Sequence, residues 1–219
     1  MDLKEAIMIR RSVRGFQQTP VSQETLRDVL TLATRAVSAN NLQPWEILVV
    51  TGDTLDQLRR MNVEDLYSNA PVDHMSAKPD EPYNHRAKAI GKALFTAMGI
   101  ARDDMEKRAW WGERGLRFFD APAVILLCMD KALGTENFRF DLGCLTQNIC
   151  LSAMEYGLGT CVEDQAIRYQ RGIRELLGVP ESKIMVTGIA IGYPDETFAA
   201  NQVKSQREPL DEVSVWYGF

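Results

Sequence analysis

Three short, strongly apolar runs limit what this chain can fold into. They lie at residues 46–51, 123–129 and 185–192, and much longer stretches with helical spacing of apolar residues separate them. Each run is rich in Val, Ile and Leu and has the length of a buried strand. Few strands among long helices predict an α+β fold with a small sheet. The chain has 219 residues, so we expect a single domain over 1–219.

Apolar residues spaced three and four apart predict the helices. One helix should begin after an N-cap at Ser22 and carry its apolar stripe as far as Val37. The segment 141–156 is apolar on most faces, which is typical of a helix inside a core or between subunits. Together with the apolar patch at 213–217, it favours a homodimer. Other helices are expected at 3–9, at 53–61, from Ile90 to Met105, and around 173–177.

Residues 63–85 form the longest stretch without a regular pattern. They contain several prolines and both histidines of the chain. A long irregular stretch in a compact domain is usually a functional lid or a mobile loop. The aromatic residues that follow are expected to belong to the core rather than to a ligand site: Trp110, Trp111, Phe118 and Phe119.

Composition excludes several classes of function. The net charge is −5, which argues against a nucleic-acid-binding protein. Because the chain has only two histidines, it is poorly suited to form a histidine-rich metal site or a Ser-His-Asp triad. No apolar run is long enough to span a membrane, the first residues do not resemble a signal peptide, and the four cysteines form no CxxC pair. We therefore expect a soluble, cytoplasmic protein with no metal and no membrane partner.

Four segments carry candidate chemistry, and each also has an ordinary structural interpretation. The basic cluster at 10–14 suits a phosphate but could be a solvated helix end. The small and amide-bearing residues at 38–45 could bind a planar polar ligand or merely connect a helix to a strand. The glycines at 157–159 allow close approach of a ligand but often only end a helix, and position 162 breaks the dinucleotide fingerprint. The segment 204–210 is by itself a charged surface tail.

Cys161 is the cysteine nearest to a candidate site. A catalytic thiol needs a neighbouring base, and the sequence identifies none. Arg10 and Arg14 could face one ligand if the turn between them stays helical.

In their order along the chain, these segments resemble the FMN-dependent nitroreductase family, in particular a nitrobenzoate-reductase-like subgroup. The family pattern Arg-Arg-Ser-x-Arg-x-Phe matches residues 10–16, and its Ser-x-x-Asn-x-Gln-Pro-Trp loop corresponds to the loop at 37–45. Two positions depart from the pattern. Val37 stands where Pro is common, and the spacing from Lys204 to Arg207 is wider than the usual Lys-x-Arg. The other matching segments are 99–104, 118–122, 141–148, 157–161, 192–194 and 207–210.

The resemblance implies an intertwined homodimer with a mostly antiparallel sheet and two FMN molecules at the subunit interface. Arg10, Ser12 and Arg207 would hold the phosphate, and Arg14 would lie near the pyrimidine edge of the flavin. Ser38, Ala39 and Asn41 would approach from the partner, while Gln147 and the backbone of Cys161, Val162 and Glu163 would line the other face. A backbone N–H, that of Glu163, would meet flavin N5. The expected cofactor-binding set also includes Arg11, Val37, Asp164 and Lys204.

The resemblance further implies a ping-pong oxidoreductase. NADH or NADPH reduces FMN, and a nitroaromatic then accepts electron pairs in steps from nitro to nitroso to hydroxylamine. The chain needs no histidine base, because the flavin performs the hydride chemistry and a guanidinium beside its N1 and O2 stabilises the reduced form. Region 63–119 is expected to form a lid on the substrate side, with Tyr83, Arg86 and Trp110 as substrate contacts, and 195–219 to pack on the partner. The alternatives are a reductive dehalogenase, a flavin-consuming enzyme of the same fold, and a non-catalytic flavin-binding protein.

Overall fold

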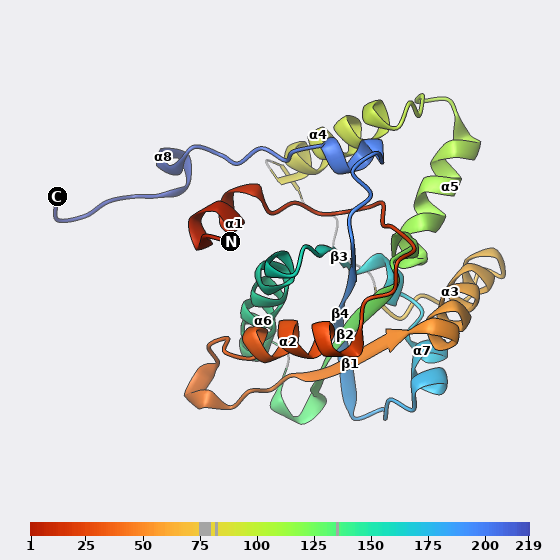
Figure 1. The fold of residues 1–219 in the computed structure, drawn as a ribbon, viewed down its shortest axis with the longest axis horizontal. Coiled ribbons are helices and arrows are strands. Elements are labelled where there is room, and N and C mark those ends of the chain that lie inside the picture. The colour runs from red at the N-terminus through yellow and green to blue at the C-terminus, as the bar shows by residue number, and fades with distance from the viewer. Residues whose placement is uncertain (75–79, 82, 135) are drawn as a thin grey trace.

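The computed structural model describes residues 1–74, 80–81, 83–134 and 136–219 (Figure 1). Within these residues the strands form one antiparallel sheet with the order β1-β2-β4-β3. The predicted α+β class and the small antiparallel sheet are confirmed. The strands are β1 (Glu46–Thr51), β2 (Ala123–Asp130), β3 (Gly159–Glu163) and β4 (Lys183–Gly192).

Helices cover both faces of the sheet, which explains why β2 is almost wholly apolar. Along β2, Ile125 and Leu127 face one core while Val124 and Leu126 face the other, as the period of two in a strand requires. Helices α2 and α6 cover the first face, and α3 and α7 cover the second (Figure 1). The helices are α1 (Leu3–Ile9), α2 (Gln23–Ala33), α3 (Gly52–Tyr67), α4 (Tyr83–Ala97), α5 (Met105–Leu116), α6 (Glu136–Glu155), α7 (Gln170–Leu177) and α8 (Leu210–Val213).

Several predicted helix boundaries are wrong. Helix α2 begins after the expected Ser22 cap, whose hydroxyl accepts from the Thr25 backbone N–H, but it ends at Ala33 and leaves Val37 outside. The helix predicted from Ile90 to Met105 is interrupted after Ala97. Gly99 adopts a φ of 63°, and the Asp104 carboxylate accepts from the Lys107 backbone N–H to begin α5. Local capping therefore overrides the apolar spacing on which the prediction was based.

The irregular segment predicted at 63–85 is shorter than expected. Helix α3 continues to Tyr67 and α4 begins at Tyr83. Residues 75–79 and 82, which also belong to that prediction, lie outside the described residues. Helix α6 begins at Glu136, before the expected start at 141.

The C-terminal residues leave the body of the molecule as an arm. Figure 1 shows α8 and the chain after it reaching past α1 and away from the sheet. The arm exposes Val215, Trp216, Tyr217 and Phe219, with Phe219 fully exposed. Within the described residues, no helix is both long and apolar enough to cross a membrane.

Candidate functional site

The chain between α1 and α2 lies along the outer side of β3. Strand β3 is at the edge of the sheet, where Ser12 forms a bridge with Thr160 and the Val13 N–H donates to the Thr160 carbonyl at 2.9 Å. Helix α1 ends at Ile9, and Arg10 has an extended ψ of 127°. The turn does not stay helical, so the condition for placing Arg10 and Arg14 on one helical face is not met. The extended backbone instead brings Ser12 and Arg14 to β3.

A buried amide fixes this segment in place. Asn201 is fully buried, and its Oδ1 accepts from the backbone N–H groups of Arg14 at 2.7 Å and Gly15 at 3.2 Å. Its Nδ2 donates to the carbonyls of Gly15 at 2.8 Å and Asp195 at 2.9 Å. All four hydrogen-bonding positions of the amide are thus used. Asn201 holds Arg14 against the start of the C-terminal region, and sequence reasoning missed it because no motif marks it.

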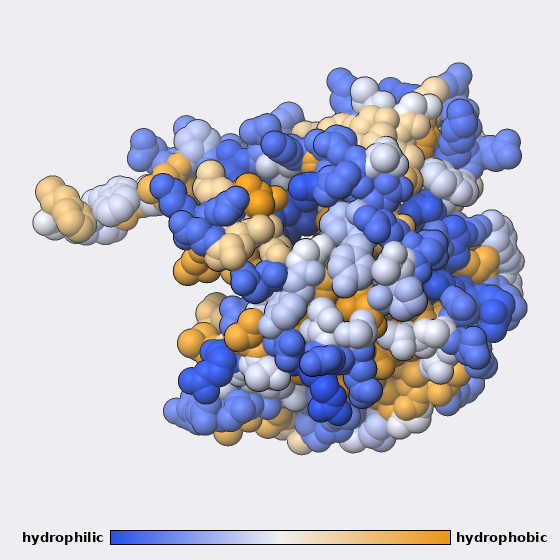
Figure 2. Space-filling view, viewed as in Figure 1, coloured by the Kyte–Doolittle hydropathy of each residue, from blue (hydrophilic) through white to orange (hydrophobic). Residues whose placement is uncertain are grey.

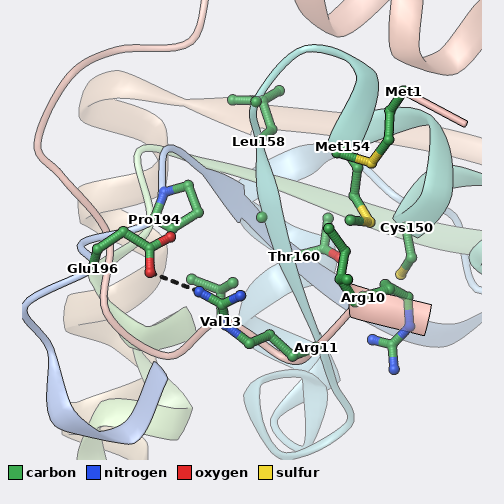
Figure 3. Close-up of a pocket in the computed structure, with 13 residues that line it drawn as sticks. Met1, Arg10, Arg11, Val13, Cys150, Met154, Leu158, Thr160, Pro194 and Glu196 are labelled. Carbon is green, nitrogen blue, oxygen red and sulfur yellow. Dashed lines mark hydrogen bonds and ion pairs between the residues drawn. The ribbon is translucent and has the colours of Figure 1, made fainter. Parts of the chain in front are cut away.

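A cavity of about 180 Å³ lies beside β3 and is lined in part by Arg10, Arg11 and Thr160 (Figure 3). Arg11 reaches Glu196 with an Nη2–Oε2 distance of 2.7 Å, but its buried Nε has no hydrogen-bond partner. A buried donor without a partner is unfavourable, and a phosphate oxygen would satisfy it. In the described part of the chain, the side chain of Arg10 makes no hydrogen bond or ion pair, and it lies beside Cys150 (Figure 3). These two arginines fit an anionic group.

Next to this cavity, Cys161, Glu163 and Arg14 form a polar cluster on β3. The Cys161 thiol donates to Glu163 Oε1 at 3.3 Å. Burial raises the pKa of the Glu163 carboxyl to about 7, although the Cys161 hydrogen bond and the charge of Arg14 oppose the shift. Burial also raises the pKa of the Cys161 thiol well above its ordinary value. The thiol therefore stays protonated, which argues against a nucleophilic role for Cys161.

The end of β3 beyond its pairing with Ser12 is partly exposed. Val162 is 44% exposed, and the following Asp164 accepts from the Thr187 hydroxyl at 2.9 Å. Gly159 lies so close to Val13 that a Cβ would stand 2.4 Å from its Cγ2. The segment after α1 can approach β3 closely only because position 159 lacks a side chain.

The residues expected in the C-terminal tail lie at a different cavity. Lys204 and Arg207, together with Arg86 of α4, line a cavity of about 710 Å³ that shares no lining residue with the one at Arg10. Arg207 Nη1 donates to the Ser205 hydroxyl at 2.8 Å and to the Gln206 carbonyl at 3.1 Å. In one chain, therefore, Arg10 and Arg207 do not line a common cavity.

The expected substrate contacts are divided between α4 and α5. The Arg86 guanidinium lies 5.6 Å from the centre of the Tyr83 ring, and both residues are exposed on α4. Trp110 of α5 is 39% exposed and lies 5.4 Å from the Arg114 guanidinium. As predicted, Phe118 and Phe119 belong to the core and Trp111 packs against it, whereas the same prediction is wrong for the exposed Trp110.

Arg114 connects α5 to the segment after α1, and sequence reasoning did not identify it. Its Nη2 donates to the Arg14 carbonyl at 3.1 Å and to the Phe119 carbonyl at 3.3 Å. Its Nη1 pairs with Asp120 at 3.0 Å, while burial lowers the pKa of the guanidinium. A single arginine inside a helix carries no spacing signal that would reveal these contacts.

The loop residues expected to come from the partner, and two further expected flavin contacts, Val37 and Gln147, lie apart from the two cavities. Val37, Ala39, Asn41 and Gln147 are exposed, and none of them lines either cavity. The loop is held to α6 by a hydrogen bond from the Ala39 N–H to the buried Asp141 carboxylate at 3.1 Å, and within the loop Ser38 Oγ accepts from the Gln43 N–H at 3.0 Å. Figure 1 places this loop below α2, on the same side of the molecule as the arm. Such exposure leaves these residues available to a second subunit.

The cationic side chains beside β3 fit the phosphate of an organic cofactor. The described residues contain no group of three or more His, Cys, Asp or Glu side chains able to hold a metal ion. They do provide Arg10 and Arg11 at the cavity beside β3 and Arg14 next to Glu163. A phosphate near the arginines and a flat polar ring along the strand edge would fit these groups.

Comparison with known proteins identifies relatives of this chain. The family model described as "Nitroreductase family" matches residues 7–193. The chain is 33% identical to the chloronitrobenzene nitroreductase of Comamonas testosteroni over 98% of this chain and 96% of the relative. It is 28% identical to the 4-nitrobenzoate reductase of Pseudomonas putida over 100% of this chain and 96% of the relative.

Solved structures agree with the sequence matches. The FMN-dependent nitroreductase NfnB from Mycobacterium smegmatis, solved in complex with NADPH, superposes with a TM-score of 0.91 at 32% identity. That match covers 99% of this chain and 100% of the other. The FMN- and NADPH-dependent nitroreductase NfnB from Sphigopyxis sp. strain HMH gives a TM-score of 0.94 at 32% identity, with 100% of both chains covered.

Proposed function

The chain belongs to the Nitroreductase family, and from this premise we propose that it is an FMN enzyme that uses NADPH or NADH to reduce nitroaromatic compounds to hydroxylamines. The arrangement of Arg10, Arg11, Ser12 and Arg14 along the edge of β3 carries this proposal. It places several cations next to the partly exposed end of β3, which suits the phosphate and ring of a flavin mononucleotide. The relatives that reduce chloronitrobenzene and 4-nitrobenzoate support the choice of acceptor.

Each part of the site has a task in this proposal. Arg10, Ser12 and Arg207 hold the phosphate, and the neighbouring Arg11 gains from a phosphate oxygen the acceptor that its Nε lacks. Arg14 faces the pyrimidine edge, where its fixed positive charge stabilises the anionic reduced ring. The backbone from Cys161 to Asp164 meets the other edge of the ring. When bound, FMN supplies the hydride chemistry, so the chain itself needs no metal and no histidine base.

We place the contacts from the loop at 38–41 on a second subunit. Ser38, Ala39 and Asn41 lie in a loop that fits a role in the partner's site, with Val37 and Gln147 beside the flavin. The exposed apolar residues of α1 and of the C-terminal arm supply the contact surface: Leu3, Ile7, Met8, Val215, Trp216 and Phe219. Figure 2 shows the surface hollowed between α1 and α2, on the side from which the arm projects. A monomer rarely exposes this much clustered apolar surface.

Two further features belong to the proposal. Region 63–119 forms the substrate side of the site, with Tyr83 and Trp110 as stacking partners for an aromatic acceptor. The enzyme works in the cytoplasm, where its unpaired cysteines stay reduced.

Turnover measurements test the proposed activity. FMN-loaded protein should oxidise NADPH in step with 4-nitrobenzoate and release the hydroxylamine, with one donor molecule consumed for each two-electron step. Turnover of a halophenol, with loss of halide and no reduction of the nitro compound, would instead identify a reductive dehalogenase. Oxidation of the donor without turnover of any acceptor would favour a non-catalytic flavin-binding protein.

A further inference from the structure

Arg114 lies in the last turn of α5, where that helix meets the segment after α1. Its Nη2 donates to the carbonyls of Arg14 at 3.1 Å and Phe119 at 3.3 Å, and its Nη1 pairs with Asp120 at 3.0 Å. Figure 1 shows the segment after α1 passing the lower end of α5. One guanidinium therefore joins two segments that are 100 residues apart in the sequence.

The ion pair with Asp120 does not by itself account for Arg114. Arg117 also binds that carboxylate, with an Nε–Oδ1 distance of 2.8 Å and an Nη2–Oδ2 distance of 3.3 Å. The side chain of Arg114 is only 13% exposed, and its buried Nε has no hydrogen-bond partner among the described residues. Burial of a charge is unfavourable unless specific contacts offset it. The contacts that Arg114 makes and Arg117 does not are those to the carbonyls of Arg14 and Phe119.

These contacts complete the fixation of Arg14. Asn201 accepts from the Arg14 N–H at 2.7 Å and Arg114 donates to the Arg14 carbonyl, so side chains hold the peptide groups on both sides of this residue. The Arg14 guanidinium lies 5.9 Å from the centre of the Phe119 ring. Phe119 has a φ of 52°, which a bulky residue adopts only where its surroundings hold it. Loss of Arg114 would release both the backbone of Arg14 and the turn beside its side chain.

The same guanidinium contacts the aromatic residue that we assign to the acceptor. Its central carbon lies 5.4 Å from the centre of the Trp110 ring and 4.9 Å from that of Phe198. Phe198 packs so closely on Gly15 that a Cβ there would stand 2.2 Å from its Cγ. Contacts between a cation and a ring are directional enough to orient the ring. Trp110 and Arg14 are therefore both positioned by one side chain.

We infer that Arg114 is a positioning residue that holds Arg14 at the flavin and Trp110 at the acceptor in one fixed arrangement. The inference rests on the proposed function, which gives Arg14 and Trp110 these tasks. The effect of Arg114 on the flavin passes through Arg14, and its effect on the acceptor passes through Trp110. One substitution at this position should therefore change both the stabilisation of reduced FMN and the binding of the acceptor.

The affinities of the protein for oxidised and reduced FMN test the first effect without turnover. Arg114→Met should lower the preference for reduced FMN by about tenfold, which is about 30 mV in the two-electron midpoint potential. The reason is that the charge of Arg14 is no longer held at the pyrimidine edge. Methionine fills the space of the arginine stem, and Asp120 keeps its ion pair with Arg117.

Arg117→Met is the matched control. It removes the same charge from the same end of α5 and also an ion pair with Asp120, but Arg117 contacts Glu113 and Asp120 rather than Arg14. This variant should keep the preference of the wild type for reduced FMN. An equal fall in both variants would show a general effect of charge and would overturn the inference.

Arg114→Lys separates position from charge. It keeps the positive charge, but a single nitrogen replaces the two that bind the carbonyls and Asp120. A positioning role predicts that lysine restores only a minor part of the lost preference. Full restoration would overturn the inference. If Arg114→Met does not fold, Arg114→Lys is compared with the wild type directly, and an unchanged potential would again overturn it.

A double-mutant cycle tests the link to Trp110. Trp110→Ala and Arg114→Met should each raise the KM for 4-nitrobenzoate by about fivefold, because the ring is lost in one and no longer oriented in the other. The double variant should have the KM of Trp110→Ala alone, since Arg114 acts on the acceptor through this ring. Effects that multiply would show independent roles and contradict the inference.

Failure of the proposed function is distinguishable from failure of the inference. The first would show in the wild type itself, as absence of bound FMN or of nitro reduction, and would remove the inference with it. The second would leave the wild type active, while the Arg114 variants keep its flavin potential and its KM for 4-nitrobenzoate.

Discussion

Asn201 shows how much of the site depends on one residue outside it. Its amide joins the backbone of Arg14 and Gly15 to that of Asp195, and it is fully buried. The direction of Arg14 toward Glu163 therefore depends on a side chain far along the sequence. A buried polar group of this kind stabilises the fold only while all of its partners remain in place.

Replacement of Asn201 should damage both stability and the site. Asn201→Ala should lower the free energy of unfolding by about 2–4 kcal/mol, because it leaves buried N–H and C=O groups without partners. It should also weaken FMN binding through displacement of Arg14. Denaturant unfolding and flavin titration measure the two effects. Gln202→Ala is the control, since Gln202 is exposed and makes one backbone hydrogen bond. Equal stability of the two variants would refute the role assigned to Asn201.

Glu163 gives the stability a defined pH dependence. Its pKa is raised from 4.5 to about 7 in the folded chain, so the folded state binds the proton more tightly than the unfolded state. The contribution of this group to stability is full below pH 4.5 and is lost as pH rises toward 7. After allowance for solvent screening, the loss is about 1–3 kcal/mol.

Unfolding of the flavin-free protein at several pH values checks this expectation. Glu163→Gln should remove the part of the decline between pH 4.5 and 7 that belongs to this carboxyl, because the amide does not titrate. A wild type and a variant with parallel stability curves over that range would contradict the shifted pKa.

At the scale of elements, the contact between the segment after α1 and β3 depends on glycine. Gly159→Ala would place a Cβ 2.4 Å from Val13 Cγ2 and 3.0 Å from Pro194 Cγ. Either the two segments separate or β3 shifts, so the variant should lose about 1–3 kcal/mol of stability and bind FMN less tightly.

Gly112→Ala in α5 provides the contrast. A Cβ there meets nothing within 4 Å, and alanine is the better helix former. This variant should gain up to about 1 kcal/mol and retain FMN affinity. Thermal unfolding and flavin titration of the two variants compare them directly. A Gly159→Ala protein as stable as Gly112→Ala would show that the close approach to β3 is not required.

The sequence predicted the strands and helices more accurately than the contacts between distant segments. The strands at 46–51, 123–129 and 185–192 were recognisable because each is an apolar run; β2 and most of β4 are buried on both sides, while the edge strand β1 is only partly buried. Helix ends were missed where capping decides them, as at Ala33 and at the interruption around Gly99. The pairing of Ser12 with Thr160 joins residues that are distant in sequence. The spacing of apolar residues along the chain cannot predict such a contact. The resemblance to a family identified both segments as parts of a site, and the structure shows that they are neighbours.

At the scale of the whole molecule, the C-terminal arm is the part whose shape is hardest to explain in a single chain. It exposes Trp216, Tyr217 and Phe219 beyond the body of the fold. Exposed aromatic residues on an extended arm are typical of segments that bury themselves on a partner. We therefore expect the arm to hold the proposed dimer together.

Removal of residues 210–219 tests this expectation. The shortened protein should shift from dimer to monomer in analytical ultracentrifugation, and it should lose FMN because the loop at 37–41 then no longer reaches a neighbouring site. Trp216→Ser should show the same change more weakly. A full-length chain that sediments as a monomer while holding FMN firmly would contradict the shared site.

Flavin content of the purified full-length protein tests the account most directly. Its visible absorption spectrum should show bound oxidised FMN, which bleaches on addition of NADPH without oxygen and returns on addition of 4-nitrobenzoate. A preparation that stays colourless after incubation with FMN would contradict the account, because the arginines beside β3 would then have a different ligand.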